Sequence, residues 1–174
     1  IVGFSVSTST GLMATLLHMF NHALMKGAVF LALGAVMYRI GSVQISQFQG
    51  LGRQMPLTMA AIVIGGLSLI GVPLTVGFIS KWYLIMATLE KGWWPVAVLI
   101  LVGSLLAVVY LWRIVEIAYF KPPLANTESI QEAPLTLLVP VWILVIANIY
   151  FGIDTRLSVE VAQAASLSLF GVSP

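Results

Sequence analysis

The sequence predicts an all-α membrane protein, a transmembrane helix bundle with one discontinuous helix. Apolar residues make up 60% of the chain and charged residues only 8%, whereas a soluble domain carries about 25% charged residues. The mean hydropathy is +1.05, so there is too little polar surface to cover a water-soluble globule. The apolar residues also form four stretches that reach the roughly 20 residues a membrane span needs. The solvent of this chain must therefore be lipid.

Charge and composition exclude several other classes of protein. The net charge is +2, from 8 basic and 6 acidic residues, which is too weak and too scattered for a nucleic-acid surface. There are no cysteines, which excludes disulfides and thiolate metal sites. No phosphate loop, nucleophile elbow or dinucleotide fingerprint is present. We therefore expect no catalytic residue, cofactor or metal in this chain.

Three of the four apolar stretches read as continuous spanning helices, and a shorter segment follows them. We expect these helices over residues 10–40, 94–120 and 134–152. The tail from Thr155 to Phe170 carries Arg156 and Glu160 near its start, and we expect it to form an amphipathic helix on the membrane surface. The chain starts at Ile1 without a signal-peptide pattern, and we interpret it as the C-terminal part of a longer protein.

The remaining stretch, residues 57–89, contains a break. Pro73 removes a backbone donor and clashes with the preceding turn, while Gly71 and Gly77 allow conformations that other residues avoid. One helix of about 33 residues would be roughly 50 Å long, too long for one upright span. Two half-helices joined by an unwound link fit better, as in the ion sites of transporters. A simple proline kink is the alternative.

The loops predict an orientation. One side of the membrane receives most of the basic loop residues, namely Arg39, Arg53, Arg113 and Lys121. The other side receives Lys91 and Arg156. The positive-inside rule makes the first side cytoplasmic, so we expect a multi-pass protein of the cytoplasmic membrane whose C-terminus is not cytoplasmic.

A stripe of ionisable residues lies within the first helix. His18, His22 and Lys26 recur at intervals of four and form one stripe about 12 Å long. Lys26 lies near the centre of its apolar run, so its amine has to be neutral, paired or hydrated in a polar cavity. Histidine titrates near neutral pH, and the stripe is therefore a candidate proton relay. Interhelical hydrogen bonds, or a two-histidine metal site, are the alternative roles.

Further charged residues lie outside the stripe. Lys81 directly follows the break and is flanked by apolar runs, so it is a candidate proton carrier, or else a charge that neutralises the freed carbonyls. Arg113 and Glu116 are three apart and can form an ion pair near a helix end. Four further acidic residues are expected to be solvated loop or tail charges, namely Glu128, Glu132, Asp154 and Glu160.

Two segments resemble a known family. Residues 17–27, with the pattern His-x3-His-x3-Lys, are similar to a helix of the antiporter-like family. That family includes membrane subunits of respiratory complex I and the large subunits of Mrp sodium/proton antiporters. Residues 71–81 resemble the family's broken helix, with its functional lysine at Lys81. The tail from Glu132 to Asp154 is most similar to the D subunit of Mrp antiporters.

The resemblance implies the C-terminal part of a fourteen-helix fold built from two inverted repeats. Residues 1–121 would supply the last helices of the second repeat, and 122–174 a loop, the final span and the tail. It also implies a proton-translocating subunit of a multisubunit sodium/proton antiporter, with other membrane subunits as partners and protons, and sodium in some members, as the ions. A membrane subunit of NADH:quinone oxidoreductase, itself without bound NADH, flavin or iron–sulfur cluster, and a non-conducting scaffold subunit are the alternatives.

Overall fold

The computed structural model describes residues 2–123 and 130–169. Throughout this part of the chain the regular elements are helical. They are α1 (Val2–Val6), α2 (Ser9–Ile40), η1 (Ile45–Phe48), α3 (Leu51–Gln54), α4 (Pro56–Ile70), α5 (Val76–Glu90), α6 (Trp94–Val115), η2 (Glu116–Phe120), α7 (Leu135–Ile153) and α8 (Arg156–Leu169). Residues 124–129 of the expected loop and 170–174 of the tail lie outside the described residues.

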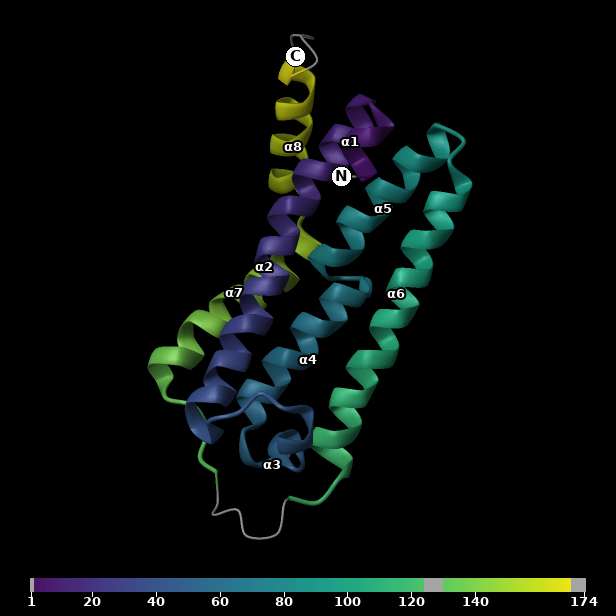
Figure 1. Cartoon of the computed structure of the whole chain (residues 1–174). Helices are drawn as coiled ribbons and strands as arrows, with labels where there is room; N and C mark the ends of the chain where they lie inside the picture. Colours follow the sequence, from purple (N-terminus) through teal and green to yellow (C-terminus); the bar gives the residue numbers. More distant parts are fainter. Residues whose placement is uncertain (1, 124–129, 170–174) are drawn as a thin grey trace.

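The long helices pack as a bundle around α2. Helices α4, α5, α7 and α8 all pack against α2, and α6 packs against α4 and α5 on the opposite side. Figure 1 shows α4 and α5 placed end to end between α2 and α6, with the break between them at mid-height. Helices α2, α6 together with η2, and α7 are each long and apolar enough to cross a membrane. The all-α bundle with one discontinuous helix that the sequence predicts is confirmed.

Local sequence sets the ends of α2 and α4. The Thr8 side chain accepts a hydrogen bond from the Gly11 backbone at 3.0 Å and caps the start of α2. Gly41 ends that helix in the left-handed conformation, with φ of 69°. Pro56 occupies the first turn of α4, where its missing N–H would be unsatisfied in any case.

Small side chains let the helices approach closely. The main core cluster joins α2, α4 and α7 through residues that include Ala28, Ala32, Met59, Ile62 and Val145. Alanines at the contact face bring neighbouring backbones near each other, as in other membrane bundles. The outward face of α6 remains apolar and uncovered, with Leu105 and Leu106 66% and 63% exposed, which suits contact with lipid.

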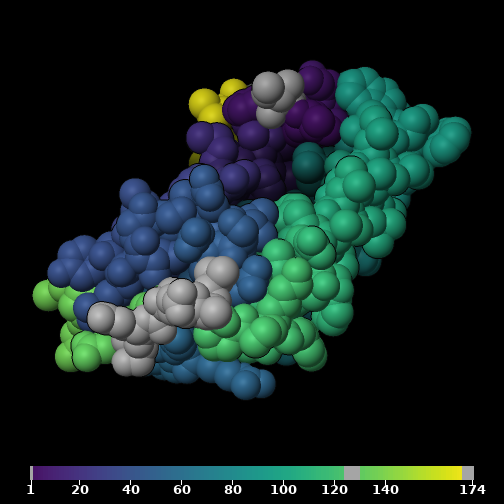
Figure 2. Space-filling model, turned by 60° about the horizontal axis from the view of Figure 1, so that its bottom comes forward, coloured from purple at the N-terminus to yellow at the C-terminus, as the bar shows by residue number. Residues whose placement is uncertain are grey.

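One end of the bundle carries the short elements. The segment with η1 and α3 lies beside η2, which continues α6, and the Gly50 amide donates to the Ile117 carbonyl of η2 at 3.4 Å. Figure 2 turns this end of the molecule toward the viewer and shows the blue segment meeting the green end of α6. Helices α1 and α8 lie at the opposite end (Figure 1).

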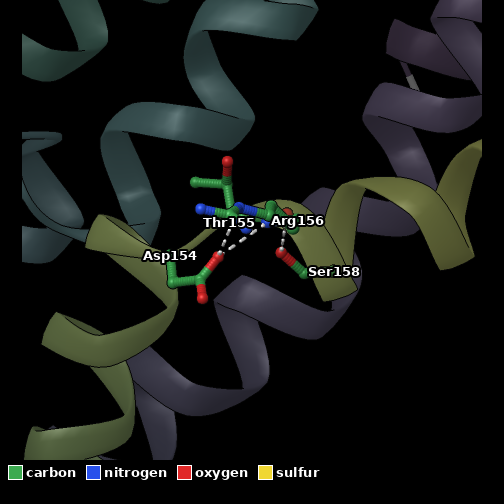
Figure 3. A network of polar contacts seen from close by, with 4 residues as sticks. All are labelled: Asp154, Thr155, Arg156 and Ser158. Carbon is green, nitrogen blue, oxygen red and sulfur yellow. Dashed lines mark hydrogen bonds and ion pairs between the residues drawn. The ribbon is translucent and has the colours of Figure 1, made fainter.

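Helix α8, which we expected to be an amphipathic helix on the membrane surface, packs against α2. Its residues Val159 and Ala162 pack against Met13 and Leu17 of α2, so one face of α8 is covered by protein. Leu157 and Val161 remain exposed on the other side. Figure 3 shows the junction that positions α8, where Asp154 Oδ1 accepts from the Arg156 amide at 3.3 Å and the Ser158 hydroxyl donates to the Thr155 carbonyl at 3.1 Å.

Candidate functional site

The break between α4 and α5 is an unwound link of residues 71–75. Gly71 ends α4 with φ of 91°, in the left-handed region, and its N–H donates to the carbonyls of Leu67 and Ser68. Leu74 in the link also has a positive φ, 71°. Each half-helix has 15 residues and is therefore about 22 Å long, shorter than the roughly 30 Å hydrocarbon core. The halves can cross a bilayer only together, which places the link at depth.

Gly77 has a different role from the one that its type predicts. We expected it to relax the backbone, as Gly71 does, but it lies in the first turn of α5 and is absent from the positive-φ residues. A Cβ there would lie 1.7 Å from the Ser68 carbonyl oxygen. Gly77 is therefore required for the close approach of α5 to the end of α4, and Pro73 lies in the link between them.

The Lys81 amine lies against the C-terminal end of α4. Its Nζ donates to the carbonyl oxygens of Leu69 at 2.8 Å and Ile70 at 2.9 Å. A third bond goes to the Ser104 hydroxyl of α6, at 2.8 Å. The last carbonyls of a helix lack intrahelical partners and carry partial negative charge. A lysine ammonium is thus well matched to this break, and the side chain is partly buried there.

The two histidines form a hydrogen-bonded pair that reaches α5. His22 Nδ1 lies 3.4 Å from His18 Nε2, and the rings meet edge to face with centroids 5.3 Å apart. His18 Nδ1 lies 2.9 Å from the hydroxyl of Ser80. Ser80 is fully buried and directly precedes Lys81. Sequence reasoning missed Ser80 because only the packing of α5 on α2 brings it to His18.

The structure divides the predicted site residues into two groups. His22, His18 and Ser80 form one network, and Lys81 with Ser104 forms the other. No hydrogen bond joins His18 to Lys81 among the described residues; the two groups are linked only through the backbone from Ser80 to Lys81. Within residues 2–123 and 130–169, Lys26 has no hydrogen bond or ion pair, and its Nζ lies 5.4 Å from the centroid of the Phe30 ring. Lys26 is exposed on α2, four residues after His22.

Buried amides surround the break. Asn21 is 1% exposed, and its Nδ2 donates to the Val76 carbonyl at 2.9 Å. The Ser68 hydroxyl donates to Asn148 Oδ1 of α7 at 3.0 Å. These bonds tie α2, α4, α5 and α7 together at one level. Asn148 is the one side-chain amide of α7, and that isolated amide was a signal in the sequence that an interhelical contact existed.

The other charged residues lie away from the break. Arg113 and Glu116 form an ion pair at 2.9 Å, with side chains 59% and 38% exposed. The expectation that Glu132 is a solvated loop charge is wrong. Its carboxylate accepts from the Leu57 amide at 2.7 Å and from the Thr58 hydroxyl at 2.6 Å, at the first turn of α4. Unpaired amides at a helix start attract a carboxylate, and Glu132 accordingly lies at the start of α4.

These features define a class: a multi-pass membrane protein whose discontinuous helix carries a lysine at its break. Residues 1–107 match the transmembrane family described as NADH:quinone oxidoreductase/Mrp antiporter. The chain belongs to this family. The resemblance found at the histidine stripe and the broken helix is thereby confirmed.

Individual relatives and solved structures agree with the family. The chain is 39% identical to NADH-quinone oxidoreductase subunit N of Desulforudis audaxviator over 88% of its length and 33% of the relative. It matches the Mrp complex of a Dietzia species with a TM-score of 0.88 at 23% identity, over 97% of this chain and 39% of that one. An archaeal membrane-bound sulfane sulfur reductase matches with a TM-score of 0.76 at 34% identity, over 82% and 24%. The chain thus spans about a third of the length of the first curated relative.

Proposed function

We propose that this chain is part of a proton-translocating membrane subunit, in which Lys81, His18, His22 and Lys26 exchange protons near the membrane midplane. One observation carries the proposal: the Lys81 amine lies at a helix break, held by the Leu69 and Ile70 carbonyls and the Ser104 hydroxyl. Ionisable groups inside a membrane are costly and usually functional. Unwound backbone at membrane depth is tolerated where it is buried in protein or lines water.

The histidine pair supports directional proton movement. If His22 Nδ1 donates to His18 Nε2, then His18 Nδ1 carries its proton toward Ser80. The Ser80 hydroxyl then donates to a carbonyl of its own helix, that of Val76 or Gly77, each at 3.4 Å. Reversing the tautomers of both rings reverses the bond between the rings and the bond between His18 and Ser80, whose hydroxyl then donates to His18 Nδ1 instead of to a carbonyl. Water has to bridge from this network to Lys81 and Lys26, since neither lysine hydrogen-bonds to it.

Two assemblies are candidates for the whole protein. The first is a multisubunit sodium/proton antiporter, whose D subunit the tail resembles. The second is a respiratory NADH:quinone oxidoreductase, which is favoured by the 39% identity to a subunit N. In both, residues 1–121 would complete the second repeat, residues 122–174 would hold the final span, and other membrane subunits would be partners. Both place the chain in the cytoplasmic membrane with a non-cytoplasmic C-terminus.

The decisive experiment uses full-length protein in its assembled complex, with proton transport followed by a pH-sensitive dye in vesicles. Lys81→Ala removes the amine, and Lys81→Arg keeps a cation that does not release its proton. We expect both variants to lose at least about tenfold in proton transport, while Arg113→Ala, at the exposed ion pair, transports normally. A scaffold role predicts that Lys81→Arg transports like the wild type. Subunits that co-purify with the protein separate the two candidate assemblies.

A further inference from the structure

Lys81 has partners of two different kinds. The carbonyl oxygens of Leu69 and Ile70 can only accept hydrogen bonds. The Ser104 hydroxyl, 2.8 Å from Nζ, can accept or donate. When it accepts from Lys81, its own proton points to the Ile100 carbonyl at 3.3 Å. Among the described partners of the amine, only Ser104 can therefore change role with the charge of Lys81.

Ser104 is isolated in its helix. From Pro95 to Val109 it is the one residue with a polar side chain, and its neighbours Leu105 and Leu106 are largely exposed on the apolar face. Its hydroxyl nevertheless accepts a hydrogen bond from the Lys81 amine of α5. A single hydroxyl placed within an apolar span and bonded to an ionisable group indicates a role tied to that group.

The two charge states of Lys81 fit this set of partners without any backbone movement. The ammonium has three N–H groups for three acceptors. When the proton passes to water, an N–H bond breaks, an O–H bond forms on that water, and the electron pair stays on Nζ. The neutral amine keeps two N–H groups for the carbonyls of α4, and its lone pair then accepts a hydrogen bond from Ser104.

We propose that Ser104 is a positioning residue that holds the Lys81 amine at the break in both protonation states and thereby sets the pH range in which Lys81 exchanges protons. This inference rests on the proposed function. Hydrogen bonds to a charged group are about twice as strong as neutral ones. Ser104 thus favours the ammonium over the amine while leaving both states fully paired.

The other titratable groups near Lys81 are few. Helix α4 has none, and those of α6, Tyr110 and Arg113, lie roughly 9 Å or more along the helix from Ser104. Helix α2 contributes His18, whose Nδ1 lies 2.9 Å from the hydroxyl of Ser80, the residue before Lys81. Helix α7 contributes Tyr150, which is 58% exposed and packs edge-on against its neighbouring phenylalanine. Helix α5 itself contributes Tyr83 and, near its end, Glu90. A change at Ser104 acts on Lys81 directly, through the hydrogen bond of 2.8 Å.

The test measures proton transport against pH in vesicles that contain the assembled complex. Ser104→Ala removes the hydroxyl, and we expect the pH of half-maximal transport to move about 0.5 to 1 unit toward acid, from the difference between charged and neutral hydrogen bonds. Ser104→Thr keeps the hydroxyl and should restore the wild-type profile. Leu106→Ala, on the exposed face of the same helix, should leave the profile unchanged.

An unshifted profile in Ser104→Ala, or an equal shift in Ser104→Thr, would overturn the inference. If Ser104→Ala does not assemble, Ser104→Cys serves in its place, because a thiol is a weak donor and acceptor and should shift the profile in the same direction. Lys81→Ala is measured in parallel. Retained transport in that variant refutes the proposed function, whereas lost transport together with an unshifted Ser104→Ala refutes only the role of Ser104.

Discussion

Removing the Glu132 carboxylate is expected to destabilise the junction of α4 and α7. Glu132 accepts from the Leu57 amide, the Thr58 hydroxyl and the amide of Ala133. Its backbone carbonyl accepts from the Arg39 guanidinium, with Nε at 2.9 Å. One residue thus joins the end of α2, the start of α4 and the segment that enters α7.

The size of the effect follows from these contacts. A hydrogen bond to a charged group contributes about 1.5–3 kcal/mol, and a carboxylate at a helix start adds about 0.3–1 kcal/mol. The bond to the Leu57 amide is exposed and the other two are partly buried, so water replaces part of what is lost. We expect Glu132→Ala to cost about 2–4 kcal/mol of unfolding free energy. Glu132→Gln keeps one acceptor oxygen and should cost about half as much.

The assay is unfolding of the purified protein in detergent, followed by tryptophan fluorescence. Glu160→Ala is the matched control, since Glu160 is an exposed acid on α8 and its loss should change stability by less than about 0.5 kcal/mol. If Glu132→Ala unfolds within that same margin of the wild type, the carboxylate does not hold α4 and the reasoning is refuted.

Two further predictions concern packing, and a third concerns an exposed ion pair. Gly77→Ala should prevent normal folding, because its Cβ would meet a backbone oxygen at 1.7 Å, and normal assembly of this variant would contradict the close approach. The control Gly34→Ala, whose Cβ would have nothing within 4 Å, should stabilise α2 by about 0.5–1 kcal/mol. Asn148→Leu should cost about 1–3 kcal/mol because the Ser68 O–H loses its acceptor. The cost should be much smaller in a Ser68→Ala background, as a double-mutant cycle would measure. Arg113→Ala should change the unfolding midpoint little, because exposed ion pairs contribute about 0–1 kcal/mol.

Lys26 shows which part of a site a sequence pattern can predict and which part it cannot. Its spacing from His18 and His22 places all three on one stripe, and the continuous helix Ser9–Ile40 preserves that stripe. The hydrogen bond between the two histidines follows from that helical spacing. Where the stripe points depends on the packing of α2, which covers His18 with α5 and leaves Lys26 exposed. A role of Lys26 in the relay stays a prediction.

The sequence by itself determined the helical membrane class, a break around Pro73 and the stripe of α2. Each depends on composition or on neighbours a few residues apart, where proline, glycine and helical periodicity act locally. Only the tertiary structure decided that Ser104 meets Lys81, that Ser80 meets His18 and that Glu132 caps α4. These contacts join residues more than twenty positions apart, and the packing of whole helices fixes them. No local pattern encodes which hydroxyl will face which amine.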